Sequence, residues 1–413
     1  MEKVELLAPA GDLERLKMAV LYGADGVYLG GQIFGMRAAA KNFSIEQIEE
    51  GVAFAHQRGV KVYLTLNIIP HNEDFEGLEE YLLQVEKTGI DAMIVSDPGT
   101  FELVQETLPD MDIHISTQAN TTNHRTINFW HKMGAERVVL ARELSFPEIH
   151  EIREKIHPEV ELEAFVHGAM CISYSGRCLL SNYMANRDAN RGACAQPCRW
   201  NYYLVEEQRP GEYMPIYEDE KGTYFMNSKD LSMIGHIPEM IESGIKSLKI
   251  EGRMKTIYYV ATIVRAYRMA IDAYYEDPEN WTFKPEWMQE IKKVSHREFT
   301  TGFYFDKPDE KEHIYADKTY HRDYTFIGLV KSYDEETGTA VIEQRNRFFK
   351  GDTVEIVGPE KETQTFVITE MINEEGEPID VAPHPKQQVR IPVNRPVKPY
   401  DMLRKERMDH DES

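Results

Sequence analysis

The first 255 residues alternate between short apolar runs and longer amphipathic stretches. Each run is rich in Val, Ile, Leu, Tyr or Phe, which is typical of a strand buried on both faces. The pattern predicts eight such strands, at Val4–Ala8, Gly26–Gly30, Lys61–Asn67, Asp91–Asp97, Asp112–Gln118, Arg137–Arg142, Glu161–His167 and Lys246–Glu251.

Amphipathic helices are predicted between these strands, for example over Leu13–Tyr22, Ile45–Gln57 and Phe75–Lys87. Ser44 and Gln47 have the spacing of a capping box at the start of the second of these helices. A glycine closes four of the helices just before a strand, as expected of a left-handed helix cap, at Gly23, Gly89, Gly134 and Gly244.

Repeated strand–helix units predict an α/β fold, a closed (β/α)8 barrel of the TIM type. An open, doubly wound sheet is the alternative, although no G-x-G-x-x-G motif follows the first strand. The last two strands are far apart in sequence, which predicts a large insertion over about 168–244 at the carboxyl end of the barrel.

The pattern changes after the barrel. Residues 256–300 have a helical pattern, and short alternating runs punctuated by Gly and Pro begin at about residue 323. We therefore expect a barrel domain over 1–322, a small all-β barrel domain of five or six strands over 323–405, and a charged, frayed tail over 406–413.

Composition narrows the class of protein. The chain has 413 residues, 42% of them hydrophobic, which excludes a disordered or fibrous chain. No stretch of 18 apolar residues occurs and the N-terminus lacks the features of a signal peptide, so we expect a cytoplasmic protein without a membrane partner. Because the net charge is −23, any contact with RNA requires a local basic patch.

Polar residues end most of the predicted strands. In a barrel of this type the loops after the strands build the active site, so these side chains are expected to meet at one mouth. Each one taken alone is better explained as a solvated strand end, whereas the whole set is better explained as a functional pocket. The set includes Asn67, Gln118, Arg142, His167, Glu251 and Arg253.

Four cysteines, the only ones in the chain, lie in the predicted insertion with the spacing C-x6-C-x15-C-x3-C, as Cys171, Cys178, Cys194 and Cys198. Four thiolates satisfy either a tetrahedral zinc ion or an iron–sulfur cluster. Structural zinc sites usually combine two close pairs, and only one close pair is present here, so the spacing favours a cluster. Zinc, two disulfides and unliganded thiols remain alternatives.

Basic residues accompany the cysteines. Arg177, Arg187, Arg191 and Arg199 lie among them, and Lys246, Lys249, Arg253 and Lys255 follow around the last predicted strand. These cations could balance an anionic cluster, bind a phosphate or carboxylate substrate, or simply be solvated. No G-x-S-x-G, H-E-x-x-H or P-loop motif is present, so common hydrolase and nucleotide sites are not indicated.

Three long segments around the cysteines resemble the signature of the collagenase-like peptidase family, whose catalytic type is unassigned. They are Glu163–Cys171, Ser175–Cys178 and Asn190–Arg199. The opening Glu5–Gly11, the segment Gly35–Ala38 and the segment Lys249–Lys255 are similar as well. The resemblance covers nearly the whole chain.

The resemblance implies a function other than the one in the family's name. Members of this length with a small C-terminal β domain are tRNA hydroxylation proteins, which take part in making 5-hydroxyuridine at the wobble position with prephenate-derived chemistry. It implies a cluster, of the 4Fe-4S type, held by the four cysteines, and zinc is the less favoured metal. The implied partners are a tRNA anticodon loop and a small carboxylate, and a second subunit or a homo-oligomer is left open.

Candidate roles follow from these considerations. Glu163, His167 and Glu251 are candidates for proton transfer, with His167 favoured by its ordinary pKa. A flipped-out uridine and the carboxylate donor would be bound by Arg37, Asn67, Gln118, Arg142, Arg187, Arg191, Arg253 and Lys255. The β domain would either hold RNA or serve in dimerisation or substrate sizing.

Two other functions are left open. A peptidase would need a reactive thiol or a zinc ion, and would work without iron. A non-catalytic iron–sulfur partner would carry a cluster but show no turnover by itself.

Overall fold

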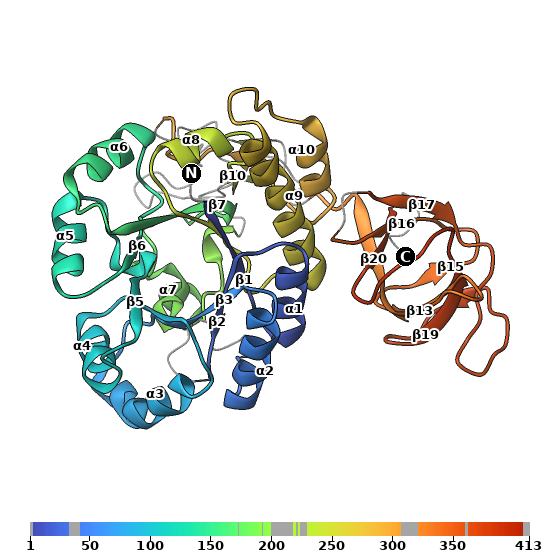
Figure 1. The fold of residues 1–413 in the computed structure, drawn as a ribbon, viewed down its shortest axis with the longest axis horizontal. Helices are drawn as coiled ribbons and strands as arrows, with labels where there is room; N and C mark the ends of the chain where they lie inside the picture. The colour runs from blue at the N-terminus through green and yellow to red at the C-terminus, as the bar shows by residue number, and fades with distance from the viewer. Residues whose placement is uncertain are drawn as a thin grey trace, which may run out of the picture.

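The computed structural model describes residues 3–32, 42–171, 173–191, 193–199, 218–219, 222–223, 229–306, 321–359 and 362–407. A strand barrel ringed by helices and a smaller β domain beside it make up the molecule (Figure 1). No helix within the described ranges is long and apolar enough to cross a membrane.

Eight parallel strands form a closed barrel, in the order β11-β1-β2-β3-β4-β5-β6-β7 with β7 pairing back to β11. The predicted barrel is thereby confirmed, and the open sheet is wrong. All eight predicted strands are present, mostly one to three residues shorter at an end, as β1 Glu5–Pro9, β2 Gly26–Gly30, β3 Lys61–Leu66, β4 Ala92–Val95, β5 Asp112–Ile115, β6 Arg137–Val139, β7 Glu161–Ala169 and β11 Ser247–Ile250.

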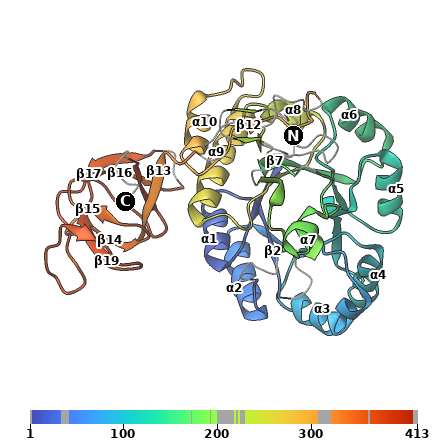
Figure 2. The same ribbon diagram turned by 180° about the vertical axis from the view of Figure 1, so that it is seen from behind.

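Helices cover the outside of the barrel (Figures 1 and 2). The predicted capping box is present at the start of the helix after Ser44. The Ser44 hydroxyl oxygen accepts a hydrogen bond from the Gln47 backbone N–H, and the Gln47 side-chain oxygen accepts one from the Ser44 backbone N–H. The ring contains α1 Leu13–Leu21, α2 Ile45–His56, α3 Leu78–Glu86, α4 Pro98–Thr107, α5 His124–Lys132, α6 Phe146–Lys155, α8 Ile237–Glu242 and α9 Ile257–Glu276, with the short 3-10 turns η1 Asn72–Phe75 and η2 Thr117–Ala119.

The long connection between β7 and β11 carries several short elements. The helix α7 (Leu180–Ala185) projects over the ring of strands in both views (Figures 1 and 2). The strand β10 (Asp230–Ser232) pairs antiparallel with β7, and β12 (Phe299–Thr300) pairs with β10. The remaining described elements are η3 Ala189–Arg191, η4 Pro197–Arg199, β8 Glu218–Asp219 and β9 Gly222–Thr223.

The C-terminal part forms the predicted all-β domain after the helix α10 (Pro285–Lys292). Its six-stranded antiparallel sheet has the order β17-β16-β20-β13-β14-β19 and surrounds a separate apolar core. The strands are β13 Tyr324–Asp334, β14 Thr339–Gln344, β16 Thr353–Val357, β17 Gln364–Val367, β19 Gln388–Pro392 and β20 Met402–Glu406, with a two-stranded addition from β15 Phe348–Phe349 and β18 Val381–Ala382.

The β domain is docked on the flank of the barrel by buried polar contacts. Tyr22, at the end of α1, donates to the carbonyl oxygens of Val357 at 2.8 Å and Tyr400 at 3.0 Å. Arg404 of β20 is fully buried and donates to both carboxylate oxygens of Glu290 in α10, each at 2.8 Å. These contacts fix the β domain against the barrel rather than leaving it on a linker.

Candidate functional site

A cavity of ≈ 460 Å³ lies at the carboxyl ends of the barrel strands. Its floor is built by side chains within the strands, chiefly Tyr28, Thr65, Phe165 and Lys249. Its walls come from residues just beyond the strand ends, and its cover comes from the segment between Ala169 and Cys198. The mouth of the barrel is therefore the place where the insertion and the strand ends meet, as the sequence predicts.

All four cysteines line this single cavity. Cys171 lies two residues after β7, Cys178 lies two residues before α7, and Cys194 and Cys198 lie between α7 and the end of η4. None of these described cysteines forms a disulfide. The backbone N–H of Gln196 donates to the Cys194 sulfur at 3.4 Å. The donor set and its convergence fit a metal centre held by four thiolates.

Arg142 connects the strand ends to the cysteine segment. Its two terminal nitrogens donate to the carbonyl oxygen of Ala169 at 2.8 Å and to the Ser175 hydroxyl at 2.9 Å. The bonded positions flank Cys171, so the guanidinium holds the start of the insertion over the cavity. The Arg142 Nε is buried and has no hydrogen-bond partner within the described residues.

Arg253 follows β11 and is only 5% exposed. One terminal nitrogen donates to the Thr65 hydroxyl at 3.1 Å and the other to the Asn42 side-chain oxygen at 3.4 Å. A Cβ atom at Gly30 would lie 2.1 Å from the second nitrogen, so only glycine leaves room for this side chain. The arginine is thereby held at the cavity wall.

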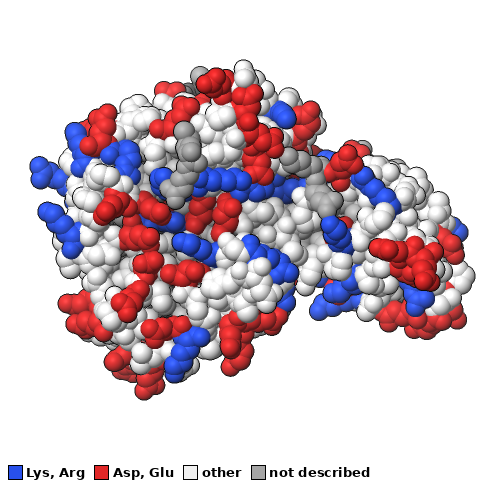
Figure 3. Space-filling view, in the orientation of Figure 1, with Lys and Arg blue, Asp and Glu red and all other residues white. Residues whose placement is uncertain are grey.

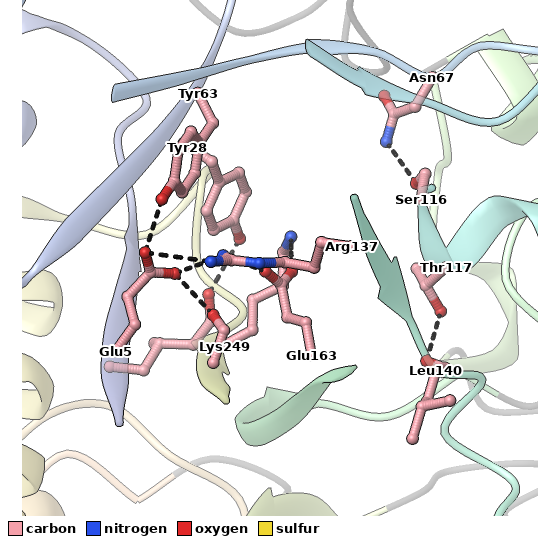
Figure 4. A network of polar contacts seen from close by, with 12 residues as sticks. Glu5, Tyr28, Tyr63, Asn67, Ser116, Thr117, Arg137, Leu140, Glu163 and Lys249 are labelled. Atoms are coloured by element: carbon pink, nitrogen blue, oxygen red, sulfur yellow. Dashed lines mark hydrogen bonds and ion pairs between the residues drawn. The ribbon is translucent and has the colours of Figure 1, made fainter. Parts of the chain in front are cut away.

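A chain of ion pairs supports the floor (Figure 4). The Lys249 ammonium lies 2.6 Å from one oxygen of Glu163, and Arg137 lies 3.2 Å from the other. Arg137 also contacts Glu5 at 2.6 Å, and the Tyr63 hydroxyl donates to Glu5 at 2.6 Å. Lys249 lines the cavity from above this network, between the rings of Tyr28 and Phe165.

Glu163 does not have the position expected of a proton donor. It is fully buried beneath the floor and does not line the cavity. Burial alone would raise the pKa of its carboxyl, but Lys249 and Arg137 outweigh burial and lower that pKa to about 2. The ionised carboxylate therefore neutralises Lys249, which is a positioning role rather than proton transfer.

His167 is also displaced from the cavity. Its ring packs among Tyr259, Tyr267 and Phe299 on the helix side of β7, and it does not line the cavity. Burial lowers the pKa of His167 to about 3, so the ring is neutral near pH 7. The pairing of β7 with β11 is irregular between Lys249 and Ile250, next to His167, which interrupts the in–out alternation assumed from the sequence.

The other predicted residues are distributed as follows. Glu251 lines the cavity and is the one carboxylate among its described lining residues. The cavity is also lined by Asn67, Gln118, Arg142, Arg187, Arg253 and Lys255. Arg37 and the side chain of Arg191 lie outside the described residues.

Sequence reasoning missed lining residues inside the strands, at Tyr28, Thr65 and Phe165, as well as Ser116 directly after β5 and Asn190 in the insertion. Alternation along the strands could have indicated the inward side chains once the barrel was assumed. Several buried oxygens here have no hydrogen-bond partner within the described residues, namely Asn67 Oδ1, Gln118 Oε1 and Asn190 Oδ1. Such acceptors are expected to bind a ligand or water.

Comparison with known proteins adds family relationships to this geometry. Two family models match the chain, peptidase family U32 over residues 11–314 and the peptidase family U32 C-terminal domain over residues 322–404. The tRNA hydroxylation protein P1 of Bacillus subtilis (strain 168) is 47% identical to this chain and covers 98% of it, over 95% of its own length. The tRNA hydroxylation protein P of Escherichia coli (strain K12) is 38% identical over 95% of this chain and 94% of its own. A protein named collagenase, from Porphyromonas gingivalis, is 34% identical over 97% of each chain.

Proposed function

Because the chain belongs to peptidase family U32 along nearly its whole length, we propose that it is a tRNA-modifying enzyme. The reaction proposed is hydroxylation of the wobble uridine to 5-hydroxyuridine, with prephenate as the oxygen donor. Relatives named tRNA hydroxylation proteins align with almost the entire chain. The observation that carries the proposal is the convergence of four thiols and several cations on one cavity at the barrel mouth.

The four cysteines would hold an iron–sulfur cluster, of the 4Fe-4S type. Their spacing along the chain, with only one close pair, favours a multi-iron cluster over a structural zinc ion, whose ligands usually come as two close pairs. When bound, the cluster supplies redox-active or Lewis-acidic iron beside the substrate.

The cations of the cavity suit an anionic donor. Arg142, Arg253, Lys249 and Lys255 all line it, and guanidinium forks bind carboxylates in a fixed orientation. A cavity of ≈ 460 Å³ lies in the range of small-molecule sites. Asn67 and Gln118 would bind the edge of the uracil ring, since each presents an oxygen that lacks a partner within the described residues.

Glu251 is the proposed proton acceptor. Hydroxylation replaces the hydrogen on C5 of uridine by a hydroxyl group. In the balanced step the C5–O bond forms as the C–O bond of the donor breaks, the donor is reduced by two electrons, and a base takes the C5 proton and passes it to the reduced donor. Glu251 directly follows β11 and lines the cavity, whereas Glu163 and His167 do not. The Glu251 carboxylate is therefore the group among the three candidates that can reach a bound base.

The tRNA would approach along α7. Tyr183 on this helix is 82% exposed, and Leu179 and Met184 are exposed beside it. The exposed Arg187 follows the helix and lines the cavity. Unstacked RNA bases stack on aromatic side chains and phosphates pair with arginine, so this helix suits the loop that delivers a flipped base.

A peptidase is the second candidate function, and the described lining of the cavity does not favour it. The cavity contains thiols but no histidine among its described residues, and the buried His167 lies outside it. A cysteine nucleophile would thus lack the neighbouring base that activates it. A non-catalytic iron–sulfur partner differs from the proposed enzyme only in turnover.

The test of function is nucleoside analysis of tRNA from a strain that lacks the gene. Complementation with the wild-type chain should restore 5-hydroxyuridine, and Glu251→Gln should restore less than about a tenth of it, since a general base contributes about 10²–10⁴-fold. Full restoration by Glu251→Gln would contradict the assignment of the base. Absence of 5-hydroxyuridine with the wild-type chain would contradict the function.

The cofactor has its own test, anaerobic purification with iron and sulfide analysis. The wild-type chain should be brown and contain both elements, and Cys194→Ala should lose most of them. Met184→Ala is a matched control, because this exposed side chain lies in the same insertion but is not a proposed ligand. A colourless wild-type protein that holds zinc would overturn the cluster assignment.

A further inference from the structure

A second group of potential metal ligands lies far from the cysteines. It consists of His131, in the last turn of α5, and His157 and Glu159, in the connection from α6 to β7. One ligand atom from each lies within 4.8 Å of the others. Within the described residues it is the one such group of three, and neither the proposed function nor the family relationship accounts for it.

The three side chains already approach a ligating arrangement. The imidazole rings of His131 and His157 stack with centroids 4.6 Å apart and planes 23° apart. His157 Nδ1 lies 3.7 Å from Glu159 Oε2. Ligands of a tetrahedral zinc ion with bonds of about 2.0–2.1 Å are roughly 3.4 Å apart. The stacked rings direct their nitrogen lone pairs nearly parallel to each other, so the His157 ring must turn for both histidines to share an ion. The exposed fractions of the His157 and Glu159 side chains, 49% and 81%, leave them room to do so.

The backbone that carries these ligands is held in place. Asn128 of α5 donates to the Lys155 carbonyl oxygen at 3.0 Å and accepts from the His157 backbone N–H at 3.2 Å. Arg153 donates to the carbonyl oxygens of His157 and Val160, both at 2.8 Å. The connection that bears His157 and Glu159 is thus fastened to the helix that bears His131, which lowers the entropic cost of binding an ion.

We infer that His131, His157 and Glu159 form a binding site for a divalent transition-metal ion. Two imidazoles and one carboxylate suit zinc and its neighbours rather than magnesium or calcium, which prefer oxygen ligands alone. The remaining coordination positions face solvent and would be filled by water. The ion would fasten α5 to the start of β7, and so stabilise the folded chain in proportion to its occupancy.

This site is independent of the cysteine site. Glu159 lies two residues before β7, whereas Cys171 lies two residues after it. The nine residues of β7 span roughly 26 Å at about 3.3 Å per residue. The two sites are therefore at opposite ends of the barrel, and one ion cannot contact both.

The experiment measures zinc bound by the full-length chain in equilibrium dialysis against Zn²⁺ alone. Zinc will also bind the cysteine thiols, so the difference between variants is decisive. His131→Ala should bind one equivalent fewer than the wild type, while His124→Ala, on the same helix but outside the trio, should bind as many as the wild type. Equal zinc content in His131→Ala and the wild type would overturn the inference.

Two further variants separate ligation from misfolding. Glu159→Gln changes an exposed side chain that leaves the fold intact, and should weaken the zinc affinity of this site by more than about tenfold. Asn128→Ala removes a positioning residue and should weaken it by about tenfold. With Co²⁺, the difference spectrum between the wild type and Glu159→Gln should lack sulfur-to-metal bands. Such bands in that difference would assign the ion to the thiols and contradict the site.

Discussion

Lys249 brings an ammonium group to the cavity floor, and Glu163 neutralises it from the layer below at 2.6 Å. Arg137 and Glu5 extend this network into the barrel interior. Breaking a buried pair by removing one partner leaves an uncompensated charge, which costs about 3–5 kcal/mol. The network therefore both stabilises the barrel and sets the charge that a bound anion meets.

Glu163→Gln should lower the free energy of unfolding by about 3 kcal/mol at pH 7, as measured by urea denaturation. Lys249 and Arg137 pull the pKa of Glu163 down to about 2 against the opposing effect of burial, below the ordinary value of about 4.3. The contribution of the ionised carboxylate is thus complete above about pH 4.3 and is lost as the pH falls toward 2. The difference in free energy of unfolding between the wild type and Glu163→Gln should therefore become smaller as the pH falls from about 4.3 toward 2.

Glu151→Gln is the matched control for this change, because it removes the carboxylate of an exposed pair with Lys155. It should leave the urea midpoint unchanged. An unchanged urea midpoint in Glu163→Gln, as expected for Glu151→Gln, would contradict a stabilising role for the ion-pair network beneath the cavity.

Single residues also mark the limit of prediction from sequence. His167 was favoured as a proton-transfer group because its ordinary pKa is near neutral, yet burial against Tyr267 and Phe299 lowers that pKa to about 3. Which face of a strand a residue occupies changes with one bulge, and no local sequence signal indicates the bulge beside Ile250. Cys171, Cys178, Cys194 and Cys198 could be grouped in advance because their spacing alone identifies them.

At the scale of elements, the barrel was predictable because most of the parallel strands are short runs dominated by apolar residues, each followed by an amphipathic helical pattern. The antiparallel strand β10 was not, since Asp230–Ser232 is short and pairs through its backbone with β7. The place of the insertion in the sequence could be predicted, but its structure could not. Its position over the mouth of the barrel depends on contacts such as those of Arg142 with Ala169 and Ser175. Long-range side-chain bonds of this kind leave no pattern along the chain.

The role proposed for α7 gives a prediction about RNA binding. Tyr183→Ala should weaken binding of an anticodon stem-loop by about tenfold, since base–aromatic stacking contributes about 1–3 kcal/mol. Tyr183→Phe keeps the ring and should bind as the wild type does. Filter binding at fixed salt would measure both. Unchanged affinity of Tyr183→Ala would place the RNA elsewhere.

At the scale of the molecule, the two domains share a buried polar interface. Arg404 donates to both oxygens of Glu290 and, at 2.7 Å, to Glu355. These pairs raise the pKa of the Arg404 guanidinium despite its burial, so it is charged throughout the ordinary pH range. The β domain is therefore expected to unfold together with the barrel rather than by itself.

Arg404→Ala should separate the unfolding of the β domain from that of the barrel. Removing the guanidinium takes away both of its bonds to the buried Glu290 carboxylate, which among the described residues keeps only Arg265 at 3.2 Å and Lys293 at 4.0 Å. The expected cost is therefore about 3 kcal/mol, the lower end of the range for a broken buried pair. Calorimetry should then show a lower first transition, followed by a second one. Arg395→Ala, which removes an exposed pair with Glu362, should keep the wild-type profile. A single, unshifted transition in Arg404→Ala would contradict cooperative docking.

The distribution of charge agrees with a localised RNA contact. On the face shown in Figure 3, acidic and basic side chains are interspersed and acidic ones gather at the outer end of the β domain. With a net charge of −23, most of the surface repels a polyanion. Arg187 is exposed and lines the cavity, so we propose it as the contact for tRNA. Lys249 and Arg253 are each only 5% exposed, so they can meet only a ligand inside the cavity.

The central claim is that this cavity hydroxylates tRNA. Its most direct test is turnover by the anaerobically purified chain, incubated with unmodified tRNA and prephenate and followed by nucleoside analysis. We predict 5-hydroxyuridine when both substrates are present, and none without prephenate or with Cys194→Ala. Unmodified tRNA after incubation with a wild-type chain that contains its full iron and sulfide would contradict the claim.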